Sequence, residues 1–153
     1  MTYIILLLFC VTLAFIADRS KTDKKNLQYN IIVFSIIAFM LSLISAIRYN
    51  VGTDYSFTYV PTFNYIMQGA TGIRIDIGFY LLNQIIIWLA LNVQWVFIVT
   101  SFIINFLICS SIYKQINYKA LGIFIYVCGT LYFFSMNGVR QTITMSIFYY
   151  SLI

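Results

Sequence analysis

Charged side chains are scarce in this sequence, and five of them stand where they could do chemistry. Only 8% of the 153 residues are charged, and histidine and glutamate are absent. Any carboxylate chemistry must therefore come from aspartates, two of which, Asp54 and Asp76, lie near arginines in the sequence. Arg48, Arg74 and Arg140 each carry a planar, permanently charged guanidinium, which binds phosphate or carboxylate bidentately. With no imidazole and no acidic cluster, the sequence predicts neither a metal site nor a cofactor.

The composition that makes these charges rare is that of a membrane protein. Hydrophobic residues make up 62% of the chain, whereas a soluble domain would carry about 25% charged residues. A soluble globular enzyme is therefore excluded, and the lipid bilayer is the expected partner. The net charge of +5 does not predict a nucleic-acid partner, because the basic residues lie in short gaps between apolar runs instead of forming a patch.

The apolar runs predict an all-α, polytopic transmembrane bundle that forms one integral membrane domain over residues 1–153. About 30 residues per span and connection give about five spans. Residues 1–17 are predicted as a span and not as a signal peptide, because no basic residue precedes them and no Ala-x-Ala pattern ends them. Residues 48–92 are predicted as an outer loop with interfacial helices. The five predicted spans are residues 1–17, 30–47, 93–113, 120–134 and 141–153.

The basic residues orient these spans by the positive-inside rule. Six of the nine fall in two gaps that the topology places on the cytoplasmic side, which puts the N-terminus outside: Arg19, Lys21, Lys24, Lys25, Lys114 and Lys119. The three remaining arginines lie on the outer face, against the rule, together with Asp54 and Asp76. Ionisable residues at a membrane boundary are costly and tend to be functional or paired. The alternative is that the arginines snorkel from helix ends while the aspartates neutralise them or cap helices.

Four short motifs then occur in a characteristic order, and together they resemble the EpsG-like family of bacterial exopolysaccharide polymerases, which is related to the Wzy-type polymerases. Asp76 departs from the pattern, since such proteins often carry glutamate there. Family members continue with more helices, so the chain resembles only their N-terminal portion and is expected to be truncated within its last helix. The motifs are Arg48-Tyr49-Asn50-Val51-Gly52-Thr53-Asp54-Tyr55 with Tyr59, Gly78-Phe79 with Leu82-Asn83, Asn92-Val93-Gln94, and Met136-Asn137-Gly138-Val139-Arg140-Gln141.

The resemblance implies glycosyl transfer on the outer side of the bacterial cytoplasmic membrane. The substrate would be an oligosaccharide linked to polyprenyl diphosphate, and other exopolysaccharide-assembly proteins would be partners. Asp54 or Asp76 would be the base, and Arg48, Arg74 and Arg140 would hold the diphosphate or orient the acceptor. Tyr55 and Tyr59 would contact sugars or belong to an aromatic belt at the membrane interface, with Asn137 and Gln141 as polar neighbours of Arg140. Gly52 would allow a turn that aims Asp54, and Gly78 would be structural.

Two other functions fit the same charges. The first is a transporter or flippase-like component that binds the lipid-linked glycan without bond chemistry. The second is a small structural membrane subunit, which would tolerate substitution of every outer-face charge. A fragment of a polymerase, moreover, need not be active by itself.

Overall fold

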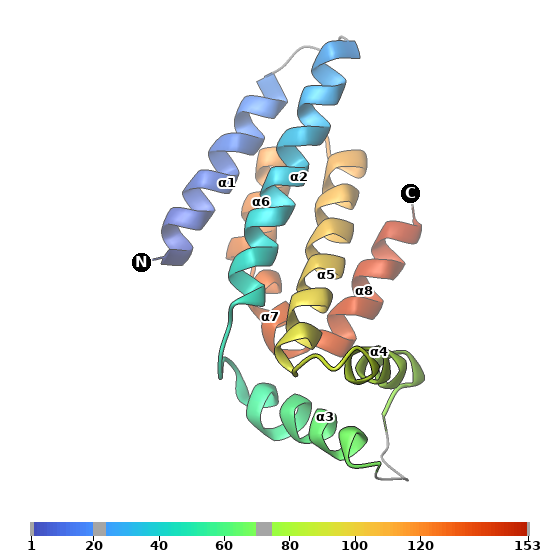
Figure 1. Ribbon diagram of the computed structural model, residues 1–153. Coiled ribbons are helices and arrows are strands. Elements are labelled where there is room, and N and C mark those ends of the chain that lie inside the picture. The colour runs from blue at the N-terminus through green and yellow to red at the C-terminus, as the bar shows by residue number, and fades with distance from the viewer. Residues whose placement is uncertain (1, 20–23, 70–74, 153) are drawn as a thin grey trace.

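The computed structural model describes residues 2–19, 24–69 and 75–152, and these residues form helices and no strands. The all-α prediction is therefore confirmed over the described part of the chain. Figure 1 shows the order of the elements along the chain. The helices are α1 (Thr2–Arg19), α2 (Lys24–Ala46), a π-helical turn (Tyr55–Tyr59), α3 (Val60–Met67), α4 (Ile77–Trp88), α5 (Gln94–Gln115), α6 (Lys119–Cys128), α7 (Leu131–Asn137) and α8 (Val139–Ser151).

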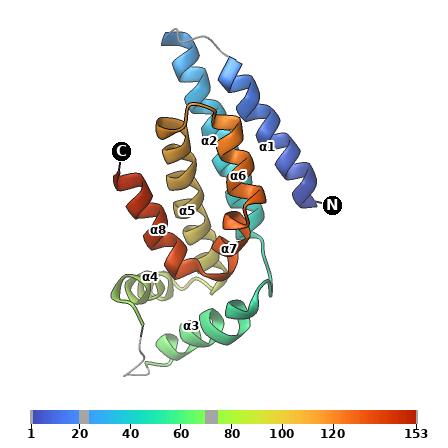
Figure 2. The same cartoon turned by 180° about the vertical axis from the view of Figure 1, so that it is seen from behind.

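The longer helices form an up-and-down bundle, and two short helices lie across one of its ends. Helices α1, α2, α5, α6 and α8 run along the bundle, whereas α3 and α4 lie crosswise beneath it (Figures 1 and 2). We call this the loop end, formed by residues 48–69, 75–93 and the α7–α8 junction. The end of α1, the first described residues of α2 and the α5–α6 connection lie at the opposite, basic end, where Asp18 pairs with Lys119 at 3.8 Å. The two predicted groups of charge thus occupy opposite ends of the bundle, apart from Lys21, Asp23 and Arg74, which lie outside the described residues.

The described residues contain fewer candidate membrane spans than the five predicted. Gln28–Ala46 and Gln94–Gln115 are each long and apolar enough to cross a membrane, and α6 with α7 would add a third crossing if this pair, bent by 48°, forms one broken span. The predicted span 120–134 therefore does not form one straight helix. A Cβ at Gly129 would lie 2.4 Å from the carbonyl oxygen of Ile125, and Thr130 has a φ of +66°, so the chain turns sharply between the two helices.

The last predicted span, residues 141–153, also needs correction. Its helix, α8, begins earlier, at Val139, and has 13 residues. At 1.5 Å per residue this helix is about 20 Å long, shorter than the roughly 30 Å hydrocarbon core. The chain does turn between α4 and α5, as predicted, and Ala90 at this turn has a φ of +55°. These two segments are separate helices and not one long span.

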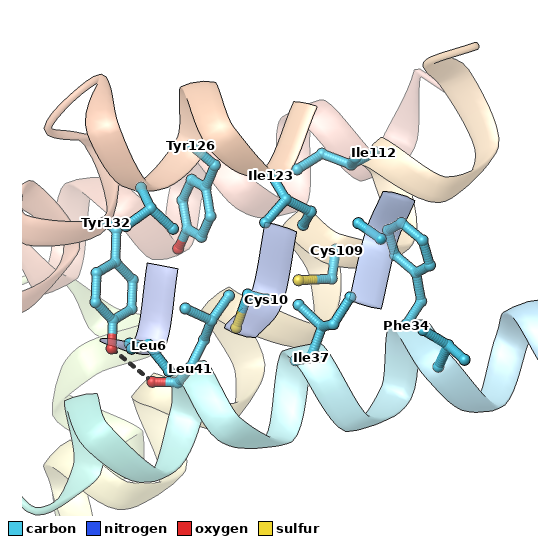
Figure 3. Close-up of a cluster of buried hydrophobic side chains, with 14 of the residues drawn as sticks. Leu6, Cys10, Phe34, Ile37, Leu41, Cys109, Ile112, Ile123, Tyr126 and Tyr132 are labelled. Atoms are coloured by element: carbon cyan, nitrogen blue, oxygen red, sulfur yellow. Dashed lines mark hydrogen bonds between the residues drawn. The ribbon is translucent and has the colours of Figure 1, made fainter. Parts of the chain in front are cut away.

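A closely packed core holds α1, α2, α5, α6 and α7 together. Figure 3 shows Leu6, Cys10, Ile37, Leu41 and Ile123 among its side chains, all at most 7% exposed. The hydroxyl of Tyr132, which is fully buried, donates a hydrogen bond of 2.8 Å to the carbonyl oxygen of Leu41. Because this bond joins α7 to the end of α2, it fixes the position of α7 at the loop end. All three cysteines are free thiols, and Cys10 and Cys109 pack in this core.

Candidate functional site

Two of the sequence motifs, far apart in the chain, are bound to each other at the loop end. The side-chain oxygen of Asn137 accepts a hydrogen bond of 3.1 Å from the backbone N–H of Asp54. Gly52 precedes this contact with a φ of +84°, and a Cβ on it would lie 2.5 Å from the same Asn137 oxygen. Glycine is therefore required at position 52 both by backbone conformation and by close approach. Gly52 has the positive φ that the predicted turn requires, and Asn137 binds the backbone that follows it.

Tyr59 connects the same two motifs through two further hydrogen bonds. Its hydroxyl donates to the carbonyl oxygen of Asn137 and accepts from the backbone N–H of Val139, both at 2.9 Å. The side chain is 3% exposed. Burial raises the pKa of the Tyr59 phenol, and the charges of Asp54 and Arg140 act on it in opposite directions. The phenol therefore stays protonated as a donor, and these two charges lie close enough to act on one hydroxyl.

Tyr55, in the first motif, packs inside the protein. Tyr55 is 7% exposed and stacks on Phe97 of α5, with ring centroids 4.8 Å apart. Tyr59 contacts the same ring edge-on and also lies against Phe79 of α4. These aromatic contacts anchor residues 55–59 to α4 and α5. In this arrangement both tyrosines pack against the protein, and a direct contact with sugar stays a prediction.

Arg48 is buried against α5. It is 5% exposed, its guanidinium lies 4.8 Å from the centroid of the Phe97 ring, and it donates a long hydrogen bond of 3.5 Å to the hydroxyl of Ser45. Two of its nitrogens, Nε and one terminal nitrogen, are buried without a hydrogen-bond partner among the described residues. Burial lowers the pKa of Arg48 to about 10, so it remains charged at neutral pH. Arg48 joins the end of α2 to α5.

Arg140 and Asp76 form the accessible charged part of the site. One guanidinium nitrogen of Arg140 lies 3.6 Å from a carboxylate oxygen of Asp76, and the two side chains are 35% and 75% exposed. They line an open pocket of about 500 Å³ with Gln141, Thr144 and Met145. An ion pair this exposed contributes only about 0–1 kcal/mol, so an anionic ligand can compete for Arg140. The pocket therefore combines a free polar surface with an available positive charge.

Asp54 is half-buried next to the motif that contains Arg140. Its backbone is held by Asn137, whereas its carboxylate has neither an ionic nor a hydrogen-bonding partner within the described part of the chain. The structure thus brings together Gly52, Asp54, Tyr59 and Asn137, and it places Arg140 next to them and to Asp76. Arg74 lies outside the described residues. A Cβ on Gly78 would meet no atom within 4 Å, so no close packing among the described residues requires glycine there.

The motifs also agree with a family comparison. The sequence profile of the EpsG family matches residues 31–153, which include all four motifs, most of α2 and every later helix. The chain belongs to the EpsG family. No curated protein and no solved structure matches it. Membership identifies an exopolysaccharide polymerase-type membrane protein, for which the family implies a lipid-linked polysaccharide substrate.

Several polar residues to which the sequence analysis assigned no site role hold the candidate site in place. Gln94, in the third motif, donates from Nε2 to the carbonyl oxygens of Ala46 and Arg48, at 2.6 and 3.1 Å, and so caps the end of α2. The hydroxyl of Ser101 donates to that of Ser45 at 2.9 Å inside the α2–α5 interface. The available signal was the set of small polar residues in otherwise apolar runs, which often mark close helix contacts in membranes.

Removing the Tyr59 hydroxyl tests the connection between the two motifs. Tyr59→Phe keeps the ring but leaves the buried N–H of Val139 and the carbonyl of Asn137 without this partner, so we expect a loss of about 2 kcal/mol in unfolding free energy. Thermal or denaturant unfolding in detergent measures the loss. Tyr49→Phe is the matched control, since Tyr49 is 80% exposed. Equal stability of the two variants would contradict the assigned role of Tyr59.

Proposed function

We propose that the protein extends a lipid-linked polysaccharide by glycosyl transfer at the loop end of the bundle. A hydroxyl on the non-reducing sugar of an incoming lipid-linked repeat unit attacks the anomeric carbon of the growing glycan. A carbon–oxygen bond forms there, the bond from that carbon to the polyprenyl diphosphate breaks, and the diphosphate leaves with the electron pair. The hydroxyl proton passes to a carboxylate. The observation that carries the proposal is the docking of the two EpsG motifs, which gathers Asp54, Asp76 and Arg140.

We assign the base to Asp54 in preference to Asp76. Asp76 is already paired with Arg140, whereas Asp54 is half-buried and fixed through its backbone by Asn137. A base must be held within hydrogen-bonding reach of the proton that it accepts. A carboxylate at a fixed turn meets that requirement better than one on an exposed helix N-terminus.

Arg140 is the proposed ligand of the leaving diphosphate. It faces an open pocket, and fixed positive charge stabilises the negative charge that develops on a departing diphosphate. Asp76 then holds Arg140 in position while the pocket is empty. Arg48 has a different role, because its buried guanidinium packs against Phe97 and supports the turn instead of facing this pocket.

The proposed reaction takes place on the extracytoplasmic side of the bacterial cytoplasmic membrane. Support comes from the separation of charges between the two ends of the bundle, because basic residues of short connections favour the cytoplasmic side. Figure 2 shows the end of α1, the end of α5 and the start of α6 at the basic end, opposite the site, and these helix ends carry Arg19, Lys114 and Lys119. A cysteine introduced at exposed Phe57, at the loop end, should react with an impermeant thiol reagent in intact cells.

Arg140→Gln distinguishes polymerisation from transport. We expect a loss of about 10- to 100-fold in glycan extension, the size of one hydrogen bond to a charged group, with single repeat units accumulating on the outer leaflet. The measurement is the chain-length distribution of the product together with leaflet-specific labelling of lipid-linked sugars. Lys114→Gln, at the basic end, is the control and should extend normally. Accumulation on the inner leaflet in Arg140→Gln would favour a transporter instead.

A further inference from the structure

An apolar groove runs along the inner side of α8. It has a volume of about 410 Å³ and is lined by side chains of α5, α6, α7 and α8, among them Ile108, Ile112, Ile125, Phe134 and Phe148. Figure 2 shows α6 and α8 on either side of α5, with α7 below them. The lining is almost entirely hydrocarbon, and α5 contributes Ile108 and Ile112 from the C-terminal half of its apolar span.

The groove adjoins the charged pocket of Arg140. Met145 lines both, so the two spaces share a wall. Gln141, Met145 and Phe148 follow one another at helical spacing on one face of α8, from the pocket into the groove. A ligand lying along this face would meet polar groups at the loop end and hydrocarbon further along. The pocket and the groove together fit an amphiphile with an anionic head group and one apolar chain.

We propose that this groove holds the first isoprene units of the polyisoprenoid chain whose diphosphate binds at Arg140. The assignment rests on the proposed function, and it adds the position of the lipid. Charge complementarity at the head selects an anion, because Arg140 is the basic side chain of the pocket. The groove is too small for a long polyprenyl chain, so the remaining units extend into the bilayer.

The polar contacts of the pocket allow this occupant. Asp76 is 75% exposed and can turn into solvent when a diphosphate replaces it on Arg140. The Gln141 side chain is exposed and can donate to phosphate oxygens, while the Thr144 hydroxyl donates to the carbonyl oxygen of Arg140 at 3.2 Å. A glycan attached to the diphosphate would then extend away from the groove, toward Asp54 and the crosswise helices.

Photolabelling of the full chain in lipid nanodiscs tests the groove. The probe is a polyisoprenyl diphosphate with a photoreactive group in its first isoprene units, and adducts are mapped by peptide mass spectrometry. We expect adducts on α8 and on the facing part of α5. Met145→Trp should fill the shared wall and lower the adduct yield at least about tenfold. Ile147→Trp is the matched control, because Ile147 lies on the same helix but lines neither the groove nor the pocket.

Further measurements distinguish binding of the diphosphate from binding of the isoprenoid chain, and they test the lipid position separately from the polymerase function. Arg140→Gln should lower labelling by the diphosphate probe about tenfold but leave labelling by the corresponding polyisoprenol unchanged. Unfolding temperatures of the two tryptophan variants are measured so that misfolding is recognised. Adducts confined to the outer faces of α1 and α2, equal competition by phosphatidylglycerol, or cross-links to a second copy would each overturn the proposal. Specific labelling of the groove without glycan extension would support the lipid position but refute the polymerase function. If Met145→Trp extends glycans and is labelled normally, the lipid position is refuted and the polymerase function is not.

Discussion

Replacing Asp54 with asparagine is expected to lower the rate of glycan extension by roughly 10²–10⁴-fold, the range for loss of a general base. Asparagine keeps the shape of the side chain but cannot accept the proton of the attacking hydroxyl. The backbone N–H of residue 54 still donates to Asn137, so the turn and the stability of the protein should be preserved. The measurement is chain extension in proteoliposomes supplied with lipid-linked repeat units, with unfolding temperature measured in parallel.

Three further aspartate variants make this test specific. Asp76→Asn breaks an exposed ion pair only, so we expect a decrease of less than about tenfold. Asp18→Asn changes the same charge at the basic end, where Asp18 accepts hydrogen bonds from the backbone of Lys119 and Ala120, and should extend normally. Asp54→Glu retains a carboxylate and should recover part of the activity. A large loss in Asp76→Asn with normal extension by Asp54→Asn would reverse the assignment of the base.

The sequence predicted the parts of the fold that depend on long uncharged runs. Residues 30–47 and 93–113 were predicted as spans, and the structure has α2 at Lys24–Ala46 and α5 at Gln94–Gln115. The prediction failed where apolar composition is uniform but the backbone turns. Residues 120–134 are apolar throughout, yet Gly129 and Thr130 break them because of close backbone approach and a left-handed φ. A glycine next to a threonine in the middle of the run was the available signal.

The sequence indicated the candidate site as a set of residues but not as an arrangement. The order of the motifs indicated Asp54, Asn137 and Arg140 and, through the family, their chemistry. Contacts between residues 78 and 83 positions apart, such as those of Asn137 with Tyr59 and Asp54, leave no local pattern in the sequence. For the same reason Arg48 and Arg140 appear equivalent in the sequence, although only Arg140 faces an open pocket.

Gly52→Ala is expected to destabilise the protein by about 3 kcal/mol and to reduce glycan extension beyond this effect. Two causes add: a left-handed φ costs a non-glycine residue about 1–2 kcal/mol, and the new methyl group collides with the Asn137 side chain. Asn137 can relieve the collision only by moving the oxygen that holds the N–H of Asp54, which costs about 1–3 kcal/mol when a buried hydrogen bond is lost. Unfolding in detergent and chain extension in proteoliposomes measure the two effects.

The other glycines separate these causes. Gly69 has a φ of +73° but open space around its Cβ position, so Gly69→Ala should show only the backbone cost, about 1–2 kcal/mol. Gly78→Ala meets no neighbour and lies in a helix, so it should be neutral or stabilising by up to about 1 kcal/mol.

A double-mutant cycle then isolates the contact between the motifs. In an Asn137→Ala background the collision is absent, and Gly52→Ala should cost no more than Gly69→Ala does in the parent protein. The same background should already extend glycans slowly, because nothing then holds the turn that carries Asp54. Strict additivity of the two substitutions would show that Gly52 and Asn137 act independently. The contact between the two motifs would then not position Asp54.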